Sequence, residues 1–107
     1  MSKHDPRETL RHMIKSCARV ETLMAAKSRA SFDTDEDLRT LIERLIEIIG
    51  EAANRMPSEF RSQYPEVAWR QVIGMRNWLI HGYDSVDIEV LWDAAHNRMG
   101  PLREQLE

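Results

Sequence analysis

Apolar residues recur every three or four positions along most of the chain, which is the spacing of an amphipathic helix. The first row of this kind follows Pro6, and proline is favoured in the first turn of a helix. Its apolar positions are Leu10, Met13, Ile14, Cys17 and Val20. The row predicts a first helix that ends near Lys27 to Ser31.

The middle of the chain carries the widest apolar stripe, and Pro57 marks its end. Thr34 or Asp33 is placed to cap this helix, and the acidic residues that follow suit the positive end of its dipole. Glycine inside a helix costs about 1 kcal/mol against alanine, so we expect another helix to pass close to Gly50. The stripe consists of Leu38, Leu41, Ile42, Leu45, Ile46, Ile48, Ile49, Ala52 and Ala53. A stripe this wide can meet more than one neighbouring helix.

The next segment is predicted to hold one short turn and a further helix. Ser58 can cap the turn, and Pro65 opens a helix from about Glu66 to His81. Gly82 fits the left-handed position just past the end of that helix.

Asp87 follows a short turn and can cap a last helix, which Gly100-Pro101 is expected to kink or interrupt. No alternating strand pattern is present in the sequence. With 107 residues, the chain fits one domain, residues 1–107. The predicted fold class is therefore all-α, an up-down bundle of four to five helices.

Composition narrows the class of protein. Hydrophobic residues make up 42% of the chain, which is enough for a packed interior, and charged residues make up 31%. No apolar run reaches the about 18 residues that span a bilayer, and the first residues lack the apolar stretch of a signal peptide. We therefore expect a cytoplasmic protein without a membrane partner. The net charge of -3 means that any contact with nucleic acid has to use a local basic patch or be weak or transient.

The sequence carries no convincing metal signature. Cys17 is the single cysteine and is expected to be a small buried hydrophobic residue. The segment DTDEDL resembles the start of a calcium loop, but Leu38 replaces the glycine and Arg44 the glutamate that such a loop requires. The histidines show no paired zinc spacing: His4, His12, His81 and His96. We expect neither a metal nor a cofactor.

The predicted helix that ends at His81 gathers polar residues on one face. At about 100° per residue, one line holds Arg70, Gly74, Asn77 and His81 within roughly 40°. A second row forms the predicted core side: Ala68, Val72, Met75 and Leu79. Asn77 and His81 therefore point the same way, whereas Arg76 lies about 140° around the helix from His81.

Three arrangements could bring Arg76 and His81 together: a long arginine side chain that wraps round, a tightened last turn, or a second subunit. A two-fold homodimer that pairs this helix with its copy would create a groove supplied by both subunits. Gly74 would permit the close backbone approach that such a pairing needs.

The residue types in this segment suit metal-independent RNA cleavage. His81 near a helix end can transfer a proton, and Arg76 can bind a phosphate through two parallel hydrogen bonds. Asn77 can orient the imidazole or a phosphate oxygen, and Tyr83 can stack on a base. The alternative is a purely structural helix cap, and these residues taken alone leave both interpretations open.

Acidic residues four apart form another line on the middle helix: Glu43, Glu47 and Glu51. Such a line is usually a solvated face. Glu51 follows Gly50 inside the apolar stripe, so we treat it, together with Arg70, as a candidate supporting residue of the site.

The motif Arg76, four residues, His81, one residue, Tyr83 resembles the RX4HXY signature of HepT-like toxins in the HEPN superfamily. The similarity covers roughly the last two-thirds of the chain and is looser over the first thirty residues. It includes the segments Gly50-Glu51-Ala52, Pro65, Trp69, Gly74-Met75-Arg76-Asn77, His81-Gly82-Tyr83 and Trp92.

This resemblance implies an all-helical homodimer and an RNA endonuclease toxin of a prokaryotic toxin–antitoxin pair. Arg76, Asn77 and His81 would be its catalytic residues. The implied partner is a minimal nucleotidyltransferase antitoxin of the MntA type, which would attach AMP to Tyr83, with ATP as the antitoxin's substrate. The rival interpretation is a non-catalytic helical subunit that only presents Tyr83 to the nucleotidyltransferase.

Overall fold

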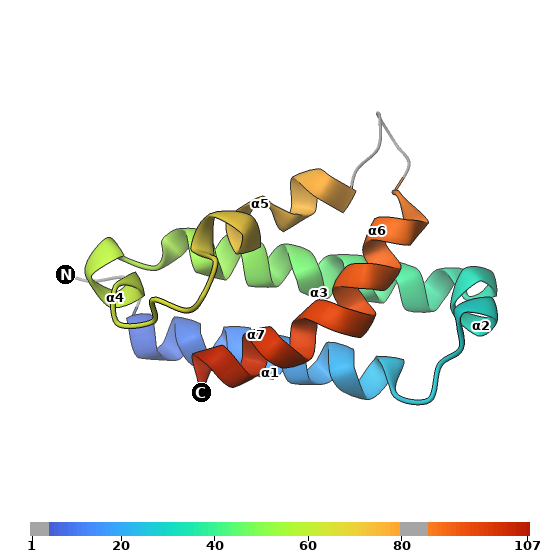
Figure 1. The fold of residues 1–107 in the computed structure, drawn as a ribbon, viewed down its shortest axis with the longest axis horizontal. Coiled ribbons are helices and arrows are strands. Elements are labelled where there is room, and N and C mark those ends of the chain that lie inside the picture. Colours follow the sequence, from blue (N-terminus) through green and yellow to red (C-terminus); the bar gives the residue numbers. More distant parts are fainter. Residues whose placement is uncertain (1–4, 80–85) are drawn as a thin grey trace.

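The structure is a computed structural model that describes residues 5–79 and 86–107. Within these residues four long helical segments run alternately up and down, and no strand is present (Figure 1). They are α1 (Pro6–Met24), α3 (Glu36–Arg55), α5 (Trp69–Leu79) and a continuous run from Ile88 to Leu106. The predicted all-α, up-down bundle is confirmed.

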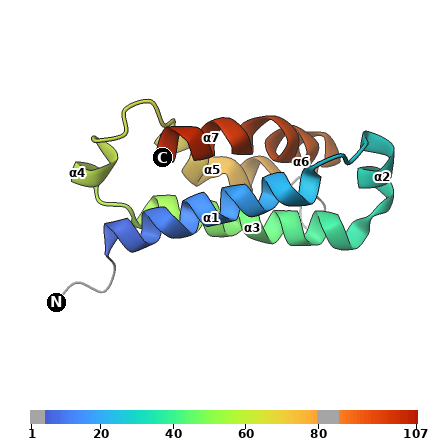
Figure 2. The same cartoon turned by 90° about the horizontal axis from the view of Figure 1, so that it is seen from below.

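The middle helix α3 holds the bundle together. It packs against α1 on one side and α5 on another, and the last segment packs back onto α1. Two short helices, α2 (Arg29–Thr34) and α4 (Ser58–Arg61), lie at opposite ends of the bundle (Figures 1 and 2). The wide apolar stripe of the sequence is thus explained by the two helices that α3 has to cover.

Helix α1 begins as predicted but ends earlier. Asp5 caps it by accepting a hydrogen bond from the backbone N–H of Arg7. The helix stops at Met24 rather than near Lys27 to Ser31, because the backbone leaves the helical conformation at Ala25 and Ala26 has a positive φ of 62°. Ser28 then caps a new helix, α2. The sequence did not predict α2, whose single buried side chain is Phe32.

The predicted cap of α3 was wrong by one or two residues. Asp35 accepts a hydrogen bond from the backbone N–H of Leu38, whereas Asp33 and Thr34 belong to α2. The insertion of α2 therefore moved the start of α3 forward.

The connector before α5 is longer than predicted. Ser58 is the first residue of α4 and makes no side-chain capping bond, so its predicted role as a cap was wrong. Helix α5 begins at Trp69 rather than near Glu66, and the Trp69 indole N–H lies 3.2 Å from each of two backbone carbonyls, Arg61 and Tyr64. The predicted end at His81, with Gly82, lies outside the described residues.

The last segment consists of α6 (Ile88–Asp93), a π-helical turn η1 (Ala94–Arg98) and α7 (Met99–Leu106). Asp87 caps α6, as predicted, by accepting from two backbone N–H groups at 3.0 and 3.3 Å. The predicted interruption takes the form of the wider π turn just before Gly100-Pro101, because Pro101 has no N–H for a regular helical bond.

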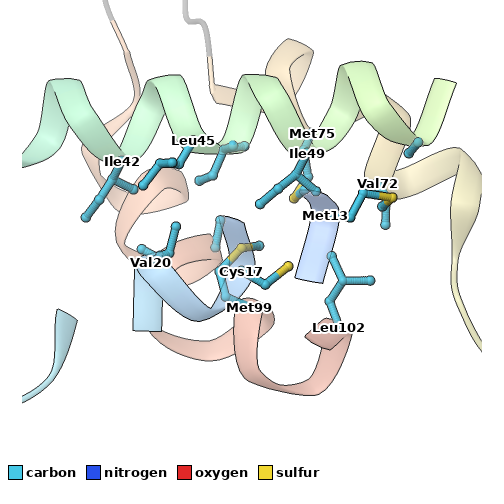
Figure 3. Close-up of a cluster of buried hydrophobic side chains, with 14 of the residues drawn as sticks. Met13, Cys17, Val20, Ile42, Leu45, Ile49, Val72, Met75, Met99 and Leu102 are labelled. Carbon is cyan, nitrogen blue, oxygen red and sulfur yellow. The ribbon is translucent and has the colours of Figure 1, made fainter. Parts of the chain in front are cut away.

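The core lies where α1, α3, α5 and α7 face one another (Figure 3). Cys17 is fully buried there, which confirms the prediction that it is a small hydrophobic residue. Burial raises the pKa of its thiol to about 12, and the nearby Glu21 carboxylate adds to that rise. Cys17 is therefore held as a neutral thiol.

Across residues 5–79 and 86–107, none of the helices combines the length and the apolar character needed to cross a membrane.

Candidate active site

A groove of about 200 Å³ lies between α3 and α5, is lined mostly by residues with charged or amide side chains, and contains two of the predicted catalytic residues. Arg76 and Asn77 enter it from α5, and Glu51 enters it from α3. The remaining lining residues are Glu47, Gly50, Asn54 and Ile73. The fold thus brings Arg76, Asn77 and the candidate supporting residue Glu51 to one place.

The floor of this groove depends on Gly50. A Cβ atom at this position would lie 3.3 Å from the carbonyl oxygen of Val72 and 3.4 Å from that of Ile73. The first distance is shorter than ordinary van der Waals contact and the second is at its lower limit, so the missing side chain lets α5 lie directly on α3. The prediction that another helix passes close to Gly50 is confirmed.

Arg76 contacts a carboxylate that the sequence did not assign to the site. Its Nε atom lies 3.5 Å from Oε2 of Glu47, and Oε1 of Glu47 accepts a hydrogen bond of 3.2 Å from Nη1 of Arg44. The Arg76 side chain is 57% exposed, so this ion pair contributes little to stability. The ion pair instead orients the Arg76 side chain, because it holds Nε at the α3 side of the groove.

The acidic line on α3 is not a uniformly solvated face. Glu51 is exposed, but Glu43 and Glu47 are half-buried. Burial raises the pKa of Glu43, and the Glu47 charge raises it further, while Arg39 opposes the rise. The regular spacing by four was the signal in the sequence that could have drawn Glu47 into the site.

The two predicted rows on α5 are largely as expected. Val72, Met75 and Leu79 are buried, whereas Ala68 precedes the helix and is exposed, so its assignment to the core row was wrong. On the polar row, Arg70 and Asn77 are exposed and Gly74 is half-buried. Arg70 does not line the groove.

Trp78 makes the outward side of α5 unusual. It is 39% exposed, and it is the large apolar side chain that stands out at the surface of the described residues. The Arg98 guanidinium lies 5.6 Å from the centre of its ring. Trp78 and Arg98 also line an apolar hollow of about 150 Å³ between α5 and α7.

His81 and Tyr83 lie outside the described residues, so their predicted roles stay predictions. The chain on either side of them is held together, because the backbone N–H of Asp87 donates to the carbonyl oxygen of Leu79 at 2.7 Å. Among the described side chains, no three His, Cys, Asp or Glu residues are grouped as metal ligands.

The bundle and its groove define a small all-helical domain with an exposed arginine and amide held between two helices. Residues 13–107 match the family described as Ribonuclease HepT-like, and the chain belongs to that family. The expected resemblance to HepT-like proteins is confirmed.

Named relatives agree with this assignment. A protein named "Putative RNase" from Caldanaerobacter subterraneus subsp. tengcongensis is 32% identical over 102 residues, covering 95% of this chain and 91% of the relative. Another "Putative RNase", from Methanocaldococcus jannaschii, is 30% identical over 107 residues, covering 100% and 98%. The "Probable ribonuclease HepT" of Thermococcus cleftensis is 37% identical over 76 residues, covering 71% and 69%. No solved structure matches the chain.

Proposed function

We propose that the protein is a metal-independent RNA endonuclease and the toxin of a prokaryotic toxin–antitoxin pair. The observation that carries this proposal is the exposed groove in which Arg76 and Asn77 lie side by side, in a chain of the HepT-like ribonuclease family. A guanidinium and an amide at an open surface suit a phosphodiester, which presents charged oxygens to bidentate donors.

The reaction is attack by the substrate's own 2′-hydroxyl on the adjacent phosphorus. The 2′-oxygen–phosphorus bond forms and the phosphorus–5′-oxygen bond breaks, leaving a cyclic phosphate and a 5′-hydroxyl. His81 accepts the proton of the attacking hydroxyl, and the departing 5′-oxygen takes a proton from solvent. Arg76 stabilises the charge on the phosphoryl oxygens, and Asn77 orients the imidazole or a phosphate oxygen.

A homodimer would complete the site. Arg70, Gly74 and Asn77 form the outward face of α5, and the exposed Trp78 adjoins it. A second copy docked on this face would cover the tryptophan and bring its own His81 toward the groove. Arg44, Arg70 and Arg76 would supply the local basic patch for RNA in an otherwise acidic protein.

The partner in this proposal is a minimal nucleotidyltransferase antitoxin of the MntA type, which attaches AMP to Tyr83 with ATP as its substrate. A phosphate and a base on Tyr83 would place negative charge beside Arg76 and compete with the RNA phosphate. The covalently attached AMP would therefore inactivate the protein by blocking the binding of RNA.

The direct test is cleavage of RNA by the purified protein with metals chelated by EDTA. Wild type is expected to cut, and Arg76→Ala and His81→Ala are expected to lose about a hundredfold or more in rate. RNA left intact by the wild type, together with AMP addition to Tyr83 by the nucleotidyltransferase, would favour the non-catalytic subunit instead.

A mixing experiment tests the dimer. If each site takes Arg76 from one chain and His81 from the other, then a mixed dimer of Arg76→Ala and His81→Ala chains retains one intact site. Random mixing should restore about a quarter of wild-type activity, since half the dimers are mixed and each has one working site. No recovery would mean that each site is built within one chain.

A further inference from the structure

We propose that Glu47 is a positioning residue for Arg76, which aims the guanidinium at the RNA phosphate. The inference rests on the proposed ribonuclease function and adds a residue that the sequence motif does not contain. It comes from one chain of contacts that joins α3 to α5 across the groove.

The contacts connect three side chains in a row, Arg44, Glu47 and Arg76. Arg44 holds one carboxylate oxygen of Glu47 at 3.2 Å, and the other oxygen of Glu47 lies 3.5 Å from Nε of Arg76. The Glu47 side chain is 31% exposed, against 57% for Arg76, so the carboxylate is the better fixed of the two. Glu47 thus gives an exposed arginine a defined attachment.

The atom that is contacted matters for the chemistry. A guanidinium has five N–H donors in a planar fork, and a carboxylate at Nε leaves the two terminal nitrogens to face a phosphate. Without that attachment, the long side chain would have to lose rotamer freedom each time it binds substrate. Glu47 should therefore favour the productive orientation of Arg76.

The same carboxylate has an opposite effect on binding. Its negative charge lies in the groove that receives an anion, together with Glu51. Glu47 therefore competes with RNA for Arg76 while it orients Arg76 for the reaction. Orientation and charge can be separated, because glutamine keeps an oxygen of similar reach beside Nε but carries no charge.

The two effects predict different kinetic changes. Glu47→Ala should lower kcat by about tenfold or more, since misplacing a catalytic group is costly. Glu47→Gln should keep kcat within about threefold of wild type because the amide oxygen can still contact Nε of Arg76. Both variants should bind RNA about three- to fivefold more tightly, as expected for removing one solvated charge from the groove.

The experiment measures kcat and KM with a short single-stranded RNA, and RNA affinity in a His81→Ala background so that the substrate stays uncut. Glu104→Gln on α7 is the control, because it removes one exposed carboxylate away from the groove. A Glu47→Ala variant with the kcat of this control would overturn the positioning role. So would a Glu47→Gln variant that loses as much kcat as Glu47→Ala, and unchanged affinity would overturn the competition with RNA.

Arg76→Ala in the same assay distinguishes a failure of the Glu47 role from a failure of the proposed ribonuclease function. If Arg76→Ala is inactive and the Glu47 variants behave like Glu104→Gln, the role of Glu47 fails and the ribonuclease proposal stands. If Arg76→Ala cuts RNA as well as wild type does, the proposed active site itself is wrong.

Discussion

Gly50 allows the packing of the groove to be tested by adding one carbon atom. In Gly50→Ala the new Cβ would lie 3.3 and 3.4 Å from the carbonyl oxygens of Val72 and Ile73. Both oxygens belong to the backbone of α5, so no side chain can rotate away. The helix itself would have to shift by a few tenths of an ångström.

Two effects of opposite sign decide the outcome. Alanine is favoured over glycine inside a helix by about 1 kcal/mol. Forcing extra atoms into a close-packed contact typically costs about 1–3 kcal/mol. The free energy of unfolding of Gly50→Ala should therefore fall by about 1 kcal/mol, with a range of about 0–2 kcal/mol.

The assay is urea denaturation at one protein concentration, with Thr40 as the matched site. Thr40 is exposed on the same helix, where Thr40→Ala should be more stable than Thr40→Gly by about 1 kcal/mol. The preference for alanine should be lost or reversed at residue 50. If alanine stabilises both positions equally, α5 does not press on α3 at Gly50, and our account of the groove is wrong.

Three other predictions concern the rest of the fold. Asp87→Ala should lower the free energy of unfolding by about 1 kcal/mol, since the carboxylate caps two backbone N–H groups of α6; urea denaturation with no loss would contradict this. The Cys17 thiol, whose pKa is raised to about 12, should react with an aromatic disulfide reagent only as the protein unfolds; rapid reaction of native protein would refute its burial. Burial raises the pKa of Glu43 above its ordinary 4.5. The native state therefore loses stability as the pH rises from that ordinary pKa through the raised pKa of the folded protein. Glu43→Gln should therefore be more stable than wild type at pH 7 by roughly a few tenths of a kcal/mol, and the advantage should vanish below that ordinary pKa.

The long helices were predictable because their apolar spacing repeats over many turns. The stripe on α3 predicted both its burial and its contact with more than one helix, and Gly50 marked the closest contact. The short α2 was missed because its single buried residue, Phe32, gives no repeating pattern. The break at Ala25 and Ala26 ends α1 early, and α2 after it moves the start of α3.

The candidate site also contains residues that the sequence predicted and one that it missed. Arg76 and Asn77 were predicted because their side chains suit phosphate chemistry and because their motif lies within one short segment of the sequence. Glu47 was missed because its partner Arg76 lies on another helix, and spacing within α3 alone favoured a solvated face. Such a pairing depends on how α3 and α5 are aligned against each other. Gly50 contacts the backbone of α5 in the folded protein, but the sequence alone does not say which residues of α5 it meets.

The three faces of α5 link the proposed homodimer to the proposed role of Glu47. Val72 and Met75 face the core, and Glu47 holds Arg76 on the α3 side. The sequence predicts that the helix continues to His81, which would put the imidazole about 140° away, on the line of Asn77. On that prediction, an Arg76 tethered to Glu47 would face away from the His81 of its own chain, which would favour a partner's imidazole for the reaction. Glu47→Ala removes the contact that holds Arg76 and should weaken that preference, so the recovery of activity expected on mixing should also fall in this background.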